Sequence, residues 1–125
     1  MEQFGQNNAH LLIHTLQGEK QFSLAEKNYW TIGRSQENDI VIRDHSMSRS
    51  HAILQCNETG DYLLIDLGSS NGSFVNGKRV SVPISLQNGD RILFGKSHVE
   101  FYALGRELST QTPREEDTQT NLLHL

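Results

Sequence analysis

Apolar residues along this chain gather in short runs that alternate with polar, turn-forming stretches. No run repeats with the 3.6-residue period of a helix, and several are rich in β-branched or aromatic residues, which favour strands. In one run, Ala52, Leu54 and Cys56 would share one face of a strand. The runs expected to be extended lie at residues 10–16, 21–24, 29–32, 39–42, 51–56, 62–67, 80–86, 91–94 and 98–104. Many short strands separated by turn signals predict an all-β sandwich.

Two Asn-Gly pairs mark tight turns, because this dipeptide adopts positive φ at little cost. Asn76-Gly77 has strand-like residues on both sides and predicts an ordinary hairpin. Asn71-Gly72 instead follows the polar run Gly68-Ser69-Ser70, to which we assign no packing role. Two hydroxyls and an amide on a sharp turn present several donors to one point in space. That arrangement suits an anion, most naturally a phosphate.

The composition changes after about residue 108. Residues 109–120 are rich in Thr, Gln and Glu and contain no apolar side chain that could repay the entropy of ordering. We therefore predict a flexible N-terminus at residues 1–9, one domain at 10–107 and a flexible Thr-rich tail at 108–125. The apolar residues 122–125 fit either a loose end of the tail or a docking peptide.

Length, cysteine content and charge exclude several classes of protein. A chain of 125 residues fits one domain, and a single cysteine excludes an internal disulfide and favours a reducing compartment. No apolar run approaches the ~18–20 residues that span a bilayer, and residues 1–8 lack the features of a secretory signal. We predict a cytoplasmic protein that contacts no membrane. A net charge of −4 without a basic cluster argues against nucleic acid as a partner.

Polar groups at the ends of predicted strands are the candidates for binding. In a β-sandwich such loops cluster at two ends, and binding residues collect there. Arg34 offers a planar, permanently charged fork that matches phosphate geometry, and Ser48 and Ser70 offer hydroxyl donors. The four groups are Gly33-Arg34, Ser48-Arg49-Ser50-His51, Ser69-Ser70-Asn71-Gly72 and Asn88-Gly89-Asp90.

The order and spacing of these groups resemble a forkhead-associated (FHA) domain over roughly residues 11–104. Phe74-Val75-Asn76-Gly77 and Phe94-Gly95 extend the resemblance beyond the four groups. It implies an FHA-type β-sandwich of about eleven strands, with binding loops at one end that take phosphothreonine peptides.

The resemblance also implies roles for individual residues. Arg34, Ser48 and Ser70 resemble the phosphate ligands, and Arg49 stands where a side chain or N–H group assists them. Asn71 resembles the residue that holds the peptide backbone beside the phosphothreonine.

Other positions would shape the site without contacting the phosphate. Gly33, His51 and Gly72 resemble the residues that shape and brace the loops. Ser46 and Met47 lie where selectivity for downstream peptide residues is set in the family. Neither is charged, so they predict no strong preference for an acidic residue at that position of the peptide.

Ser48, His51 and either Asp44 or Asp66 also allow a hydrolase to be considered. Ser48 and His51 are three residues apart in a loop, however, and no Gly-x-Ser-x-Gly elbow surrounds the serine. The six histidines show no metal-ligand spacing. We therefore predict neither catalysis nor a metal or other cofactor, and we expect His51 to brace its loop.

The sequence thus predicts a phosphothreonine-dependent adaptor that binds a protein phosphorylated by an upstream Ser/Thr kinase. The alternative is a structural or assembly β-sandwich module whose contacts do not depend on phosphate. Four tail threonines are either unmodified and solvated, or phosphorylated so that the tail occupies this domain's own site, in cis or between self-associated chains. They are Thr110, Thr112, Thr118 and Thr120.

Overall fold

The computed structural model describes residues 8–104, and these residues form eleven strands and no helix. The strands are β1 (Asn8–Thr15), β2 (Gly18–Leu24), β3 (Tyr29–Gly33), β4 (Ile40–Val41), β5 (Ala52–Cys56), β6 (Tyr62–Asp66), β7 (Ser73–Val75), β8 (Lys78–Arg79), β9 (Ile84–Leu86), β10 (Arg91–Phe94) and β11 (Ser97–Leu104). The all-β class is therefore confirmed. The predicted tail at 108–125, with its four threonines, lies outside the described residues.

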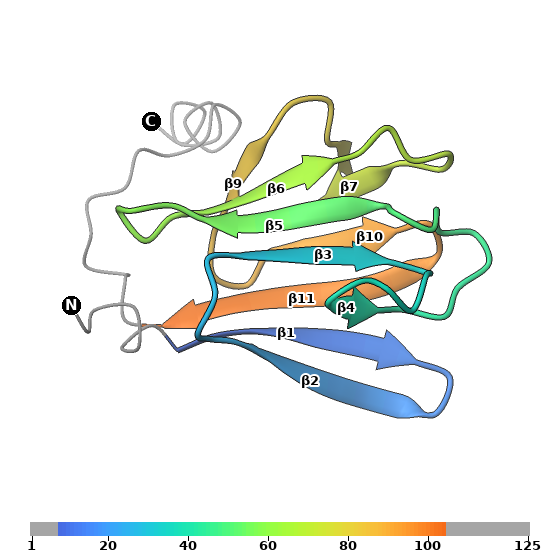
Figure 1. Ribbon diagram of the computed structural model, residues 1–125, viewed down its shortest axis with the longest axis horizontal. Coiled ribbons are helices and arrows are strands. Elements are labelled where there is room, and N and C mark those ends of the chain that lie inside the picture. Colours follow the sequence, from blue (N-terminus) through green and yellow to red (C-terminus); the bar gives the residue numbers. More distant parts are fainter. Residues whose placement is uncertain (1–7, 105–125) are drawn as a thin grey trace, which may run out of the picture.

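The strands form two sheets that pack face to face (Figure 1). One sheet has six strands in the order β2-β1-β11-β10-β7-β8, and the other has five in the order β4-β3-β5-β6-β9. Within residues 8–104, the paired strands run antiparallel except β3 and β4, which run parallel. The sandwich expected from the alternating runs is confirmed.

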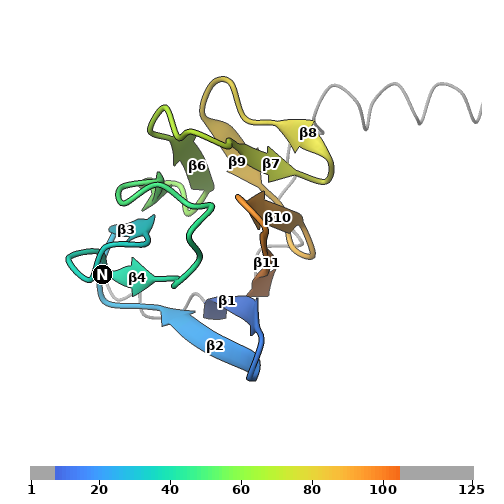
Figure 2. The same ribbon diagram turned by 90° about the vertical axis from the view of Figure 1, so that its right-hand side faces the viewer.

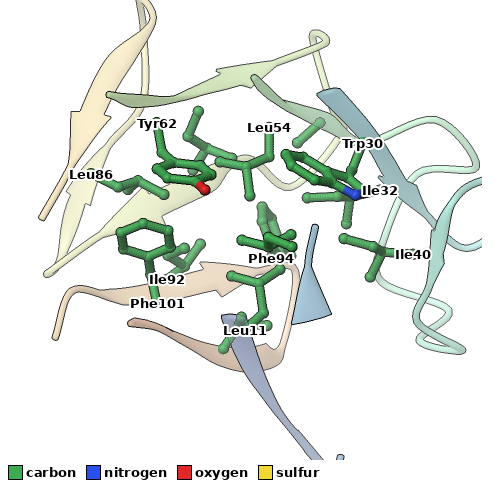
Figure 3. Packing of buried hydrophobic residues seen from close by; sticks show 14 of the residues in the cluster. Leu11, Trp30, Ile32, Ile40, Leu54, Tyr62, Leu86, Ile92, Phe94 and Phe101 are labelled. Atoms are coloured by element: carbon green, nitrogen blue, oxygen red, sulfur yellow. The ribbon is translucent and has the colours of Figure 1, made fainter. Parts of the chain in front are cut away.

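Inward-facing side chains of both sheets build one core (Figure 3). Ala52, Leu54 and Cys56 are all buried, as their alternation predicts. Aromatic contacts join the two layers, because Tyr62 of the five-stranded sheet lies 5.2 Å from Phe101 of the six-stranded sheet, measured between ring centroids.

Several strand boundaries differ from the sequence expectation, among them the start of β2 at Gly18 instead of residue 21. β1 begins at Asn8, two residues before the predicted start of the domain. Of the run 80–86, only Ile84–Leu86 pairs as a strand, at the edge of the five-stranded sheet. The reason is that Val80 still donates its N–H to Ser73 in the other sheet, so the chain must cross between sheets before β9 begins.

The connections that carry most of the candidate residues meet at one end of the sandwich. These are the β3–β4, β4–β5, β6–β7 and β10–β11 connections, at the right of Figure 1 and facing the viewer in Figure 2. The turn at 88–90 lies at the opposite end, so the fourth polar group does not join the other three. There the Gly89 N–H donates to Phe101, and Asp90 is 95% buried beneath the amide of Asn76.

Candidate anion-binding site

Gly33 brings the β3–β4 loop against the β4–β5 loop. The backbone N–H of Arg34 donates to the carbonyl of Ser48 at 3.1 Å, and that of Ser35 donates to the carbonyl of Arg49 at 3.3 Å. A Cβ atom on Gly33 would lie 2.0 Å from the Arg49 carbonyl oxygen, so only glycine permits this approach. The two loops are thereby joined along their backbones.

One hydrogen bond holds the guanidinium of Arg34 in place. Its Nε donates to the carbonyl of Met47 at 3.1 Å, and the side chain is half-buried. Among the described residues, its two terminal nitrogens donate to no partner. A charged fork is therefore positioned, with its two ends available to a ligand.

Ser48 and Ser70 meet although they lie on different loops. The Ser48 hydroxyl oxygen accepts the N–H of Ser70 at 3.0 Å, which leaves the hydroxyl proton of Ser48 free to be donated. Ser70 itself is exposed. Hydrogen bonds thus link the three loops that carry Arg34, Ser48 and Ser70. Arg49 is also exposed at this end.

Asn71 links the β6–β7 loop back to the β4–β5 loop. Its Nδ2 donates to the carbonyl of Ser46 at 2.7 Å, and the side chain is exposed. One amide donor is occupied, while the amide oxygen faces no described hydrogen-bond donor. A peptide N–H group would complement that oxygen.

His51 is fully buried and connects the loops from beneath. Its Nδ1 accepts the N–H of Ser48 at 3.0 Å, so the proton lies on Nε2, which donates to the carbonyl of Gly72 at 3.0 Å. The imidazole ring packs nearly perpendicular to the ring of Phe94, with 5.5 Å between ring centroids. Because both ring nitrogens are engaged, His51 does not act as a base toward the Ser48 hydroxyl.

Asp66 organises the β6–β7 loop, a role that the sequence analysis missed. It accepts the N–H of Ser69 at 2.9 Å, the hydroxyl of Ser69 at 2.7 Å and the hydroxyl of Ser73 at 2.6 Å. Partial burial would raise the pKa of Asp66, but these hydrogen bonds outweigh it and lower the pKa overall. An aspartate three residues before a serine at a strand end was the available signal.

Ser69 corrects the expectation that its polar run has no packing role. Its side chain is buried, donates to Asp66 and accepts the N–H of Gly72 at 3.0 Å. Only the hydroxyl of Ser70, not that of Ser69, is therefore available at the surface of this turn. Gly72 has a φ of 86°, which a residue with a side chain adopts only under strain.

Asp44 is the second carboxylate that the sequence analysis did not place. It accepts hydrogen bonds from the N–H and hydroxyl of Ser46, the hydroxyl of Ser97 and the N–H of Lys96. Partial burial would raise the pKa of Asp44, but these donors outweigh it and lower the pKa from 3.8 to about 2. The carboxylate therefore ties the β4–β5 loop to the β10–β11 turn.

The two positions expected to set peptide selectivity are occupied within the fold. Met47 is 98% buried, so its side chain belongs to the core and does not face a ligand. The Ser46 hydroxyl donates to Asp44 and accepts the N–H of Lys96 at 2.9 Å. Direct selection of peptide residues by either side chain is not supported by this arrangement.

Residues 8–104 contain no group of three or more His, Cys, Asp or Glu side chains placed to hold a metal ion. The same part of the chain contains no helix long and apolar enough to cross a membrane.

Known proteins share the sequence pattern and the fold of this chain. The FHA domain family matches residues 30–95. An oxoglutarate dehydrogenase inhibitor from Corynebacterium efficiens is 41% identical over 73 residues, which cover 58% of this chain and 50% of that protein. The chain thus spans about half the length of the curated relatives that it matches first.

Solved structures show the same sandwich. One, from work on phosphothreonine-dependent FHA domain interactions, has a TM-score of 0.67 and 29% identity, covering 75% of this chain and 94% of that chain. Another is Mycobacterium tuberculosis EmbR in complex with a low-affinity phosphopeptide, with a TM-score of 0.66 and 29% identity. That comparison covers 74% of this chain and 24% of EmbR.

Proposed function

The chain belongs to the forkhead-associated domain family, and from this premise we propose that it is an adaptor that binds phosphothreonine in a partner protein. The observation that carries the proposal is the set of hydrogen bonds that links the three loops carrying Arg34, Ser48 and Ser70. The structural relatives described as binding phosphopeptides support it.

The proposed ligand matches the chemistry of the loops. A phosphothreonine brings nearly two negative charges and three acceptor oxygens at neutral pH. Each charge-assisted hydrogen bond contributes ~1.5–3 kcal/mol before the costs of ordering are subtracted. Several such bonds, less the cost of fixing an extended peptide, leave ~7–9 kcal/mol, which is micromolar affinity. A complex of that strength recruits a partner and still dissociates.

We assign the phosphate contacts to Arg34, Ser48 and Ser70, with Arg49 assisting. Asn71 would contact the peptide backbone, because its amide oxygen faces no described donor. Positioning residues lie behind these groups and do not touch the ligand. They are Gly33, His51 and Gly72.

The proposed role is non-catalytic. The hydrogen bonds of His51 leave Ser48 without a general base, which is the part that a serine hydrolase needs. The adaptor would act downstream of a Ser/Thr kinase, in the cytoplasm where such a kinase phosphorylates its substrates. The named activity of the Corynebacterium efficiens relative, inhibition of an enzyme, is compatible with a regulatory binding module.

Replacing Arg34 tests the proposed function. Arg34→Ala should weaken binding of a phosphothreonine peptide by ~2–5 kcal/mol in titration calorimetry, because the phosphate loses its permanently charged partner. Arg43→Ala is the matched control, since it removes an exposed arginine to which we assign no contact. Both variants should melt at about the wild-type temperature.

Matched unphosphorylated and phosphoserine peptides complete that experiment. The unphosphorylated peptide should not bind. Unchanged affinity in Arg34→Ala, or partner capture that survives phosphatase treatment, would instead favour the phosphate-independent assembly module.

We also propose that a phosphorylated tail threonine is one ligand of this site. A tether raises the effective concentration to the millimolar range, which exceeds what a micromolar site needs. Phosphorylating the whole chain should then shift the NMR signals of the binding loops or increase the oligomer mass. Replacing all four tail threonines by alanine should remove the effect. The candidates are Thr110, Thr112, Thr118 and Thr120.

A further inference from the structure

Arg79 is a surface cation whose position is defined by its neighbours. It lies on β8 directly opposite Phe74 of β7. Its guanidinium carbon lies 5.8 Å from the centre of the Phe74 ring, within the range of a cation–π contact. The side chain therefore extends along the sheet surface beside the β6–β7 loop.

The guanidinium of Arg79 also packs against Gly72. A Cβ atom built on Gly72 would lie 3.1 Å from its Cζ and 3.2 Å from its Nη2. Gly72 follows Asn71 directly and is two residues from Ser70, so Arg79 lies beside the loop that carries these two candidate residues. Figure 2 shows β7 and β8 on one side of this loop end and β3 and β4 on the other.

The described part of the chain supplies no counter-ion for Arg79. It forms no ion pair there, although the whole chain carries a net charge of −4. The carboxylate that begins this loop, Asp66, already accepts hydrogen bonds from Ser69 and Ser73. A held, exposed guanidinium without an internal partner is suited to an anion supplied by a ligand.

We propose that Arg79 forms a second anion subsite, which binds a carboxylate or second phosphate two or three residues away from the phosphothreonine. The proposal rests on the proposed function of the first site. A peptide in extended conformation rises ~3.3 Å per residue, so such a group would lie ~7–10 Å from the first phosphate. This distance suits a cation placed beside Gly72, two residues beyond Ser70. Selectivity for acidic peptides then comes from Arg79, not from Ser46 or Met47.

Gly72 takes part in this subsite through its missing side chain. Any Cβ atom there would press against both Arg79 and the ring of Phe74, the latter at 3.2 Å. The glycine therefore lets the guanidinium lie close to the peptide-binding loop.

Matched sets of three phosphothreonine peptides test the subsite by titration calorimetry, with one set for each of four positions. These positions lie two and three residues before and after the first phosphothreonine, and the three peptides of a set carry alanine, aspartate or a second phosphothreonine there. At one of these positions the wild-type chain should bind the aspartate peptide about three-fold more tightly than the alanine peptide. The peptide with the second phosphothreonine should bind about ten-fold or more tightly than the alanine peptide. The aspartate and phosphate arms distinguish the two sources of negative charge.

Variants of Arg79 assign that preference. Arg79→Met keeps an unbranched chain over Phe74 and removes the charge, so it should abolish the preference while binding the alanine peptide as the wild type does. Arg79→Lys should keep part of the preference, because its charge remains without the fork. Lys78→Ala is the matched control, since it removes the adjacent exposed cation. It should change neither the preference for the acidic peptides nor the affinity for the alanine peptide.

The outcomes separate this proposal from the function on which it rests. A wild-type chain that binds the three peptides equally at every position has a phosphothreonine site without the second subsite. A preference that persists in Arg79→Met overturns the assignment to Arg79. Failure of the wild-type chain to bind any of these peptides overturns the proposed function as well.

Discussion

Gly33 shows how a single residue determines the position of the candidate ligands. An added Cβ atom would meet the Arg49 carbonyl oxygen at 2.0 Å and the Asn38 amide nitrogen at 2.7 Å. The Arg49 carbonyl belongs to the backbone, so it has no flexible end that could move aside. The loop that carries Arg34 would therefore have to shift.

We expect Gly33→Ala to lower the free energy of unfolding by ~1–3 kcal/mol, as overpacked sites do, and to weaken phosphothreonine binding. Urea denaturation and peptide titration measure the two effects. Ser50→Ala, at an exposed position of the facing loop, should change neither. Wild-type stability in Gly33→Ala would show that the loops tolerate separation.

At the scale of residues, the sequence could indicate the type of site but not the direction of each side chain. Arg34, Ser48 and Ser70 carry groups that suit a phosphate wherever they lie. The inward orientation of Ser69 depends on Asp66, and the burial of Met47 depends on the core beneath its loop. These contacts arise only when segments far apart in sequence pack together.

At the scale of elements, the β7–β8 hairpin depends on Asn76. This residue has a φ of 51°, donates to Asp90 at 2.9 Å and accepts the N–H of Arg91 at 3.0 Å. It thus combines a left-handed turn conformation with two hydrogen bonds to the β9–β10 connection and β10. Two substitutions separate these contributions.

We expect Asn76→Gly to cost ~1–2 kcal/mol of stability, because it loses the hydrogen bonds but adopts positive φ freely. Asn76→Ala should cost about 1 kcal/mol more, since it adds backbone strain. Chemical denaturation would show the difference, and phosphopeptide affinity should be unchanged because this turn lies at the other end. Equal losses of stability in the two variants would mean that backbone strain at residue 76 contributes nothing.

Most strands were predictable because their apolar residues alternate locally. The confirmed hairpin at Asn76-Gly77 was predictable for the same reason, as its turn chemistry is local. The region before β9 was not, because its conformation follows from a crossing between sheets. A local pattern of extended residues does not show which sheet a segment joins.

At the scale of the whole molecule, Asp44 connects the two sheets at the loop end. Its partners include Ser46, in the loop that enters the five-stranded sheet, and Ser97, at the start of β11 in the six-stranded sheet. The charged form of Asp44 accepts all of these hydrogen bonds. Stability should therefore depend on its protonation state.

Acid should remove the stabilisation that the charged form of Asp44 provides. The pKa of Asp44 is lowered from 3.8 to about 2, so the unfolded chain binds the proton first as the pH falls. The stabilisation is present at neutral pH and is lost between about pH 5 and pH 2. Asp44→Asn should be less stable than wild type at pH 7, by about 1–2 kcal/mol after allowance for solvent screening. The urea midpoints of the wild type and of Asp44→Asn should converge as the pH falls through this range. A difference that stays constant would show that the charge of Asp44 does not provide the stabilisation.

The first and last described strands have a consequence for how this domain can be combined with others. Asn8 pairs with Leu104, at the end of the sandwich away from the candidate site (Figure 1). In a longer polypeptide, the segments before and after the domain would therefore both connect at this end, opposite the loops of the candidate site. A fusion partner attached at this end, such as a fluorescent reporter, would leave the candidate site accessible. The domain is therefore suited to the construction of a fluorescent biosensor.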